Sequence, residues 1–400
     1  QSGGDILVDG NEGGVAANSV ASGVAIVQLN SQFINWTGGA LTILDPHANT
    51  TASNTLAFNN STAHVNVPNT HTLKLGDGVS TDAGGNATNG FRLSTFVGSR
   101  RISFGNLEVN TTGGTNRQVT TASNIGFNGN VTIEPSSEVV FGTSYVAGNI
   151  VNNGTFTSTA VLGLASYTDG TVSATTNAQT IGGSGVYRNL AAAPTANLTS
   201  LTVNNTNATG VTLSVPLSVS GTLTMTSGII NTTTTNLLTL GTATAAGTLA
   251  GTPSATNMVR GPFARTIANA NANTNYILFP VGKVAYAPVW AAPATTAVTV
   301  MKAETFDSNT GTQSAAITNM ATNRRWELPV LSGTITDINV RLGDAGILTT
   351  SIPVQAPSAS GLYTSTFGSV ATAVAGVSTQ STTPVLSASY TGFLSYADSN

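Results

Sequence analysis

The chain has 400 residues, of which 7% are charged and 40% are hydrophobic, and it contains no cysteine. A net charge of −3 gives no electrostatic footprint for nucleic acid or anionic lipid. The lack of cysteine excludes disulfides, zinc–thiolate sites and thiol catalysis. Because Thr, Ser, Asn or Gly interrupts every apolar run, none reaches the about 20 residues of a membrane-spanning helix.

The polar surface has to come from Thr, Ser, Asn and Gly, and these residues favour strands and turns. Windows with helical periodicity are scarce. We therefore predict an all-β fold, in which a β-helix-like or stacked short-strand solenoid is followed by a C-terminal β-sandwich. The expected regions are a β-rich region at 1–120, solenoid-like repeats at 121–250 and the sandwich at 251–400.

The N-terminal segment QSGGDILVDG is polar and glycine-rich apart from one short apolar stretch. We expect Gln1 to be a mature terminus left by signal-peptide cleavage, and the protein to be secreted to the cell surface or the extracellular space. The apolar stretch, Ile6, Leu7 and Val8, is the segment that we expect to donate a strand to a neighbouring copy.

Three histidines, His47, His64 and His71, fall in or beside a region of short strands with Asn and Gly corners. On adjacent rungs they could form a metal site. No acidic or thiol partner stands at ligand spacing, so we favour exposed loop histidines.

The loop KLGDGVSTDAGG places Asp77 and Asp82 five residues apart, upstream of the pair Arg100 and Arg101. Enzymes that cleave acidic polysaccharides on a β-helix combine calcium-binding carboxylates with an Arg or Lys base. Asp77 and Asp82 are therefore candidates for calcium. Since neither EF-hand nor calcium-nonapeptide spacing is met, we favour a solvated turn and expect no other cofactor.

Residues 129–159 show the strand pattern most regularly. Strands are predicted at Val131–Ile133, Val139–Phe141, Asn149–Val151 and Thr155–Thr157, with Gly and Asn at the corners. A period near 20 residues is typical of a parallel β-helix. Ordinary antiparallel sandwiches are the alternative, because short alternating strands with turn signals suit both.

Glu134 and Glu138 bracket a Pro-Ser-Ser turn within this region. Their spacing could bring two carboxyl groups together, as glycoside hydrolysis requires. Nothing else in the sequence supports catalysis, so we favour carboxylates at strand ends that face water.

An uncharged run extends from Asn189 to Val259 and contains VTLSVPLSVSGTLTMTSGIINTTTTNLLTLG at 211–241. In a parallel stack, equivalent side chains lie about 4.8 Å apart on successive rungs. Like charges would repel there, whereas Thr and Asn ladders can form hydrogen bonds. The run therefore predicts short strands that stack on copies of themselves.

Charged and aromatic residues return after residue 250, as expected for a separate sandwich. The segment NRRWELP combines Arg324, Arg325, Trp326 and Glu327, which could bind a sugar through a cation–π arrangement. Strand alternation places Trp326 and Leu328 on one face, so we expect both in the core.

Asn-x-Ser/Thr sequons occur from Asn35 to Asn231 and not beyond. This asymmetry supports two regions and makes the N-terminal part a candidate for glycosylation. The candidate positions are Asn35, Asn49, Asn60, Asn86, Asn110, Asn130, Asn153, Asn197, Asn204, Asn207 and Asn231.

Several ordered motifs carry a resemblance to a family. QTIGGSGVYRNL, LTVNN, the 211–241 segment, MVRGPFART, LFPVGKVAYAPV and NRRWEL resemble the repetitive secreted surface proteins of Bacteroidota, many of them cargo of the type IX secretion system. The similarity covers roughly 125–345 and implies an exported surface or fibre role with no catalytic residue. It also implies a C-terminal sorting domain that these 400 residues do not include, so we expect its removal on export or another route of secretion.

The sequence therefore predicts a structural protein that self-assembles into a surface fibre, filament or sheath by strand addition or end-to-end stacking. Its partners would be copies of itself. The alternative is a monomeric adhesin or glycan-binding surface protein that uses exposed aromatics such as Trp36, Tyr187 or Trp290. A polysaccharide-degrading β-helix is a third alternative, and we predict that the protein is not an enzyme.

Overall fold

The computed structural model describes residues 3–8, 27–29, 33–44, 55–58, 64–79, 90–95, 102–111, 118–121, 124–190, 196–370 and 372–399. This part of the chain contains no α-helix and is built from short β-strands. The all-β prediction is confirmed. The chain divides into two compact units, unit 1 (Gln1–Val215) and unit 2 (Pro216–Asn400).

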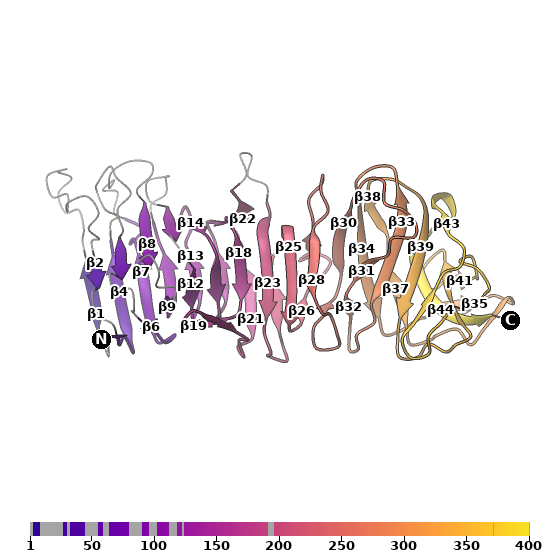
Figure 1. The fold of residues 1–400 in the computed structure, drawn as a ribbon, viewed down its shortest axis with the longest axis horizontal. Coiled ribbons are helices and arrows are strands. Elements are labelled where there is room, and N and C mark those ends of the chain that lie inside the picture. The colour runs from indigo at the N-terminus through magenta and orange to yellow at the C-terminus, as the bar shows by residue number, and fades with distance from the viewer. Residues whose placement is uncertain are drawn as a thin grey trace. The chain divides into compact units, whose positions relative to one another are not determined.

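Unit 1 is a parallel coil in which successive strands join three sheets in turn, so that each strand pairs with its equivalents one turn before and one turn after (Figure 1). Sheet A contains β1 (Asp5–Val8), β4 (Gly39–Ile43), β7 (His71–Leu75), β10 (Asn106–Val109), β13 (Val131–Ile133), β16 (Ile150–Asn152), β21 (Gln179–Gly182) and β24 (Val211–Leu213). Sheet B contains β2 (Val27–Leu29), β5 (Leu56–Phe58), β8 (Phe91–Thr95), β11 (Val119–Thr121), β14 (Glu138–Phe141), β17 (Thr155–Ser158) and β22 (Val186–Asn189). Sheet C contains β3 (Phe33–Ile34), β6 (His64–Asn66), β9 (Ile102–Phe104), β12 (Ile125–Phe127), β15 (Ser144–Val146), β18 (Val161–Leu164) and β23 (Leu198–Asn204).

The register of these sheets places apolar residues above one another in the interior of the coil. In sheet A, Leu73 of β7 pairs with Leu107 of β10, and Leu75 pairs with Val109. All four side chains are buried. Since strand side chains alternate between faces, the residues between them face outward, as the expected alternation requires.

A column of aromatic rings connects sheets B and C inside unit 1. Phe104 and Phe127 of sheet C stack at 6.2 Å between ring centroids, and Phe127 lies 5.6 Å from Phe141 of sheet B. The column continues through Phe156 to Tyr187, at 5.5 and 5.7 Å. Burial of such rings is a major part of core stability, and here it joins successive turns of the coil.

The parallel pairing contradicts antiparallel sandwiches in unit 1, and the turns are less uniform than the predicted period near 20 residues. Val131 pairs with Ile150, nineteen residues later, whereas Asp5 pairs with Ala40, thirty-five residues later. The length of a turn varies because the connections between strands vary, while the strands themselves remain in register.

One connection in unit 1 contains an antiparallel hairpin, β19 (Ser166–Thr168) and β20 (Thr171–Ser173). Its two corner residues, Asp169 and Gly170, have φ values of 56° and 82°. Positive φ at both positions is the requirement of a type I′ turn, which Asp-Gly satisfies readily. The neighbouring strands β18 and β23 pair across the insertion without a shift.

Unit 2 begins with further parallel strands. They are β25 (Leu217–Ser227), β26 (Ile230–Asn231), β27 (Leu238–Leu240), β28 (Thr248–Gly251), β29 (Val259–Arg260), β30 (Phe263–Ile267) and β32 (Val281–Gly282). In the sheet that contains β27, the parallel pattern ends at β30, which pairs in parallel with β27 on one side and antiparallel with β34 on the other.

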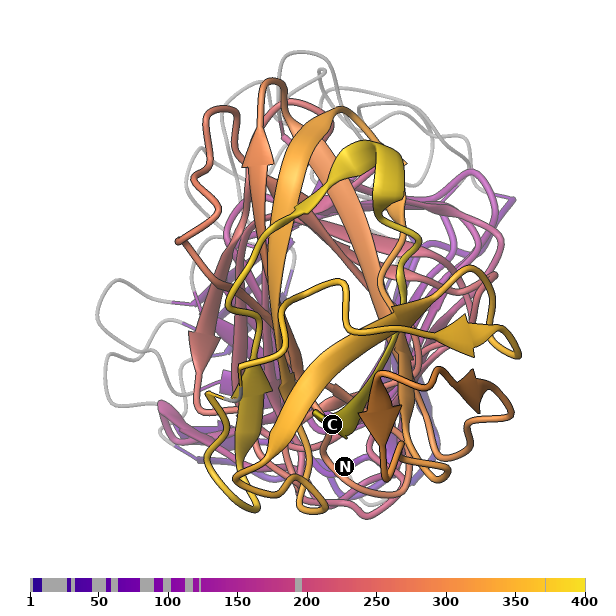
Figure 2. The same cartoon turned by 90° about the vertical axis from the view of Figure 1, so that its right-hand side faces the viewer.

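Two antiparallel sheets follow in unit 2, as the sandwich prediction requires (Figure 2). Sheet D contains β31 (Ile277–Phe279), β33 (Val289–Thr295), β39 (Ile335–Gly343), β42 (Ser378–Gln380) and β43 (Val385–Leu386). Sheet E contains β34 (Thr299–Phe306), β36 (Ile317–Thr318), β37 (Arg325–Glu327), β38 (Val330–Ser332), β40 (Ser351–Ala356) and β44 (Phe393–Ser399). The short parallel pair β35 (Thr312–Gln313) and β41 (Leu362–Tyr363) and the 3₁₀ turn η3 (Ser387–Ser389) complete the unit.

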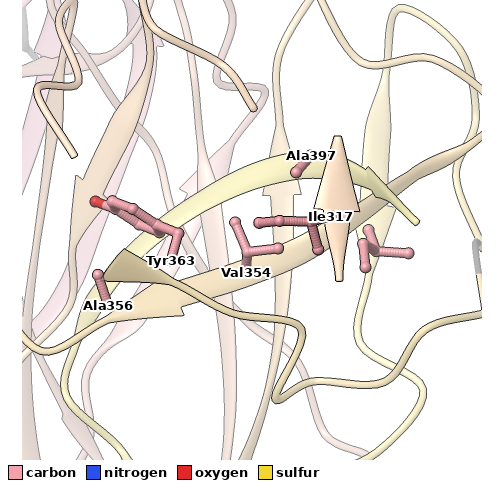
Figure 3. Packing of buried hydrophobic residues seen from close by; sticks show 6 residues of the cluster. Ile317, Val354, Ala356, Tyr363 and Ala397 are labelled. Carbon is pink, nitrogen blue, oxygen red and sulfur yellow. The ribbon is translucent and has the colours of Figure 1, made fainter. Parts of the chain in front are cut away.

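Sheet E has its own apolar cluster, in which Ile317, Val354, Tyr363 and Ala397 pack together (Figure 3). A hydrogen bond connects the two sheets of the sandwich, because the Thr379 hydroxyl of sheet D donates to the Ser351 carbonyl of sheet E at 2.6 Å. The boundaries predicted at residues 120 and 250 remain predictions.

Candidate functional site: an open strand edge and an asparagine corner

The predicted assembly segment lies in the first strand of sheet A. Ile6, Leu7 and Val8 belong to β1, which pairs in parallel with β4, and the Asp5 carboxylate accepts a hydrogen bond from the Ala40 N–H at 3.0 Å. Within the described ranges, β4 is the sole strand that pairs with β1. The other edge of β1 is therefore open there, with Ile6 46% and Leu7 66% exposed.

The backbone of β1 also shows which groups point toward that open edge. The carbonyls of Gly4 and Val8 accept hydrogen bonds from Ala40 and Leu44, on the β4 side. Because backbone groups alternate in direction along a strand, the N–H and C=O of Leu7 point away from β4. They are available to a further parallel strand.

A second feature is a stack of asparagines at the corner between sheets C and A of unit 1. We call it the asparagine corner and define it by the residues Asn69, Asn106, Asn128, Asn130, Asn149 and Asn177.

The carboxamide oxygens of the asparagine corner connect successive turns. Asn106 Oδ1 accepts from the Asn130 N–H at 2.9 Å, Asn130 Oδ1 from the Asn149 N–H at 2.8 Å, and Asn149 Oδ1 from the Thr180 N–H at 2.8 Å. Each side chain therefore satisfies a backbone donor that the turn would leave unpaired. Asn106, Asn130 and Asn149 thus form an asparagine ladder in which each side chain bonds to the backbone of the next turn.

Glycines permit this close stacking. The Gly129 N–H donates to Gly105 O at 3.0 Å, and the Gly148 N–H donates to Gly129 O at 3.1 Å. A Cβ atom at position 148 would lie 2.5 Å from the Gly129 carbonyl carbon, which is too close for any side chain. The corner therefore requires Gly before each of Asn130 and Asn149.

The asparagine corner borders a groove of about 420 Å³ on unit 1. The described residues that line it are asparagines, glycines and Ala178, and none of them is charged. Trp36 belongs to the same corner one turn earlier, because the Thr70 hydroxyl donates to the Thr37 carbonyl at 2.7 Å. Its half-buried indole stacks on His71, with 4.8 Å between ring centroids.

The structure places His71 in the interior and not in an exposed loop. The ring is buried, and neither nitrogen has a hydrogen-bond partner among the described residues. Burial lowers the pKa of the imidazole, because the charged form loses its water. His47 and the side chain of His64 lie outside the described residues, and no group of three metal-ligating side chains occurs within the described part of the chain.

The calcium candidates are not brought together by any described contact. Asp77 is exposed, and its carboxylate accepts the Val79 N–H at 2.8 Å, which is the geometry of a solvated turn. Asp82, Arg100 and Arg101 lie outside the described residues.

Glu134 and Glu138, the candidate pair for glycoside hydrolysis, do not interact with each other among the described contacts. Glu138 forms an ion pair with Arg188 and accepts the Thr157 hydroxyl at 3.1 Å, and Arg188 Nε donates to the same hydroxyl at 3.0 Å. Glu138 therefore connects three turns of sheet B. Glu134 makes no described contact with it.

The NRRWELP segment is a structural element of unit 2. Trp326 and Leu328 are fully buried, as alternation predicted, and the indole N–H donates to the Ala287 carbonyl at 2.8 Å. Arg324 is buried between Asp307 and Asp344. Arg325 lies over the ring of Phe306 at 3.8 Å, and the sugar-binding alternative considered for Trp326 does not form.

Tyr187 and Trp290, two of the aromatic residues expected to contact a glycan, differ in exposure. Tyr187 is 5% exposed and donates to the Gly182 carbonyl at 2.9 Å, so the expectation of an exposed ring is wrong. The reason is the aromatic column, in which Tyr187 packs on Phe156. Trp290 is partly exposed, with the guanidinium of Arg341 at 5.7 Å.

The candidate sequons differ in accessibility. Asn35 and Asn130 are exposed, whereas Asn110, Asn153, Asn204, Asn207 and Asn231 are half-buried. Asn197 is 5% exposed and accepts from Asn189 at 3.0 Å. Asn49, Asn60 and Asn86 lie outside the described residues.

The groove was missed by sequence reasoning, although a signal for it exists. The dipeptide Gly-Asn recurs at 105–106, 129–130 and 148–149, each time directly before an apolar strand residue. If each dipeptide is taken to mark the corner between sheets C and A, the three positions predict which residues lie above one another on successive turns.

These observations define unit 1 as a three-sheet parallel β-helix with an asparagine-lined corner. Comparisons with protein families, with curated proteins and with solved structures find no match for the chain. Among the described residues, no helix has the length and apolar character needed to cross a membrane.

Proposed function

We propose that the chain is a structural, self-assembling subunit of an extracellular surface fibre, filament or sheath. The single observation that carries the proposal is the open edge of β1, where the N–H and C=O of Leu7 point away from β4. A neighbouring copy would add a parallel strand there and continue the stack.

The chemistry of the stack supports the proposal. A net charge of −3 on 400 residues gives little repulsion between copies. Inside unit 1, turns already join through parallel strands and asparagine side chains. The same contacts can join one copy to the next, because they depend on backbone groups and neutral amides.

A proline at the open edge tests the proposal. Leu7→Pro removes the outward N–H and leaves the hydrogen bonds of Gly4 and Val8 to β4 in place, and proline is tolerated on edge strands. We expect the unaltered full chain to form filaments in negative-stain electron microscopy and large species in sedimentation. Leu7→Pro should abolish both.

Leu7→Val is the matched control, because it keeps the N–H and an apolar strand-forming side chain. It should assemble, and all three proteins should show the same circular dichroism and thermal unfolding when monomeric. A parent chain that stays monomeric at every concentration, or a Leu7→Pro chain that still forms filaments, would contradict the proposal.

A further inference from the structure

We infer that the asparagine corner of unit 1 binds a neutral glycan chain. This activity is independent of the proposed assembly role, since the groove lies at the corner between sheets C and A and not at the edge of β1. The inference is carried by the orientation of the carboxamides, the absence of charge in the groove and the position of Trp36.

The asparagine ladder engages carboxamide oxygens of residues that line the groove and leaves some of their amide donors unpaired. The Oδ1 atoms of Asn106, Asn130 and Asn149 are occupied by backbone N–H groups of the next turn. The Nδ2 groups of Asn130 and Asn149, and the carboxamide of Asn69, have no hydrogen-bond partner within the described ranges. The amide donors of Asn130 and Asn149 stand on adjacent turns, about 4.8 Å apart, and can donate to oxygen acceptors of a ligand. The Nδ2 groups of Asn106, Asn128 and Asn177 already donate within unit 1.

The lack of charge selects the class of ligand. None of the described residues lining the groove carries charge, so a polyanion would find no cation to pair with. A calcium ion would need about six to eight oxygen ligands, and the ladder oxygens are already engaged. Sugar hydroxyl and ring oxygens match the donors without bringing a charge.

Trp36 provides an apolar surface on the same corner. Its indole is held in place by the stack on the buried ring of His71. An immobilised aromatic ring beside a few directed polar groups is the usual composition of a small-molecule site. Trp36 does not line the groove itself. A glycan chain that continues one turn beyond Asn69 along the corner would come to it.

The experiment is affinity electrophoresis of the full chain through gels containing mannan, dextran or mixed-linkage β-glucan, with polygalacturonate as the acidic comparison. We expect retardation by at least one neutral polymer and none by polygalacturonate. Two substitutions should weaken the retardation about tenfold or more. Asn69→Ala removes a donor outside the ladder, and Ala178→Trp fills the groove from an exposed lining position.

Asn153→Ala is the matched control, because Asn153 belongs to a different corner, where it accepts from the Ser184 N–H at 3.2 Å. It should bind as the parent chain does, and unchanged circular dichroism would show that every variant is folded. Retardation by none of the neutral polymers, retardation by polygalacturonate alone, or full binding by Ala178→Trp would overturn the inference.

Discussion

Unit 1 and unit 2 accommodate charged side chains in different ways. In unit 1, opposite charges face each other on neighbouring turns at partly exposed positions, as in the pair Lys74 and Glu108 at 3.2 Å. In unit 2, Arg324 is 6% exposed and lies between Asp307 and Asp344. A parallel stack admits charge where the sign alternates between turns, whereas an antiparallel sandwich can enclose an ion pair.

The ion pairs of unit 1 correct the expectation that a parallel stack avoids charge. Repulsion between like charges was expected to keep charge out of the stack, and the run from Asn189 to Val259 fits that rule. Glu138 and Arg188 show the second solution, in which a carboxylate and a guanidinium bracket a threonine on the turn between them.

The largest expected difference between the units concerns these ion pairs. Arg324→Ala would leave Asp344, which is 8% exposed, buried without its partner. Removal of one member of a buried pair costs about 3–5 kcal/mol. We expect this loss in the free energy of unfolding of unit 2, measured by chemical denaturation of a Trp36→Phe background, in which tryptophan fluorescence comes from Trp290 and Trp326 of unit 2.

Arg188→Ala is the corresponding change in unit 1. Its side chain and that of Glu138 are 30% and 20% exposed, so solvent screens the pair and the cost should be about 1 kcal/mol or less. Equal losses in the two units would refute the distinction between stacked and enclosed charge.

The next effect concerns the asparagine corner, which has no counterpart among the contacts that join sheets D and E. Asn149→Ala removes the acceptor of the Thr180 N–H, which is half-buried, so the cost should lie at the lower end of the about 1–3 kcal/mol of a fully buried unpaired donor. We expect a loss of this size in unit 1 and faster hydrogen exchange at the Thr180 amide. Asn149→Asp keeps the acceptor and should lose less than half as much, and identical losses would count against the ladder.

The smallest effect is a pH dependence confined to unit 1. Because burial lowers the pKa of His71 below its ordinary value of 6.5, the unfolded chain binds the proton more readily than the folded one. The stability of unit 1 should therefore be complete above pH 6.5 and decrease as the pH falls below it. Urea midpoints at pH 8 and pH 5.5 measure this.

His71→Phe keeps a ring to stack on Trp36 and removes the titrating group. The difference between the two midpoints should then shrink in unit 1 and stay unchanged in unit 2. A His71→Phe chain that retains the full pH dependence would show that other groups cause it.

The strands of the regular region could be predicted from alternation alone. Those expected at Val131–Ile133 and Val139–Phe141 are β13 and most of β14. Asn149, however, is a corner residue and β16 begins at Ile150, because its side chain bonds to the next turn. β15 was not predicted, because one of its two buried residues is Ser144 and the strand therefore lacks the apolar alternation that marks β13.

The interior of the coil could not be predicted from the sequence. Phe127, Phe141 and Phe156 belong to one column, but they lie on strands of two sheets that are separated by connections of different length. Tyr187 was expected at the surface but packs on Phe156 in this column. Whether a side chain packs in the interior depends on strands one turn away, and the local sequence pattern does not predict those contacts.

The asparagine corner could be predicted from the sequence only in part. Recurrent Gly-Asn dipeptides are visible in the sequence, and Asn106, Asn130 and Asn149 connect turns through bonds from side chain to backbone. The ladders predicted for the uncharged run remain a prediction. The groove beside them follows only from the alignment of turns of unequal length, which requires the three-dimensional register.

The β19–β20 hairpin has a consequence for how such a chain can change over time. β18 and β23 pair without a shift although an Asp-Gly hairpin intervenes between them. A corner of the coil can therefore receive a new segment without refolding of its neighbours, since each turn depends mainly on the turns next to it. Duplication of a turn, or grafting of a foreign peptide between Asp169 and Gly170, would lengthen or decorate the coil and leave its framework intact.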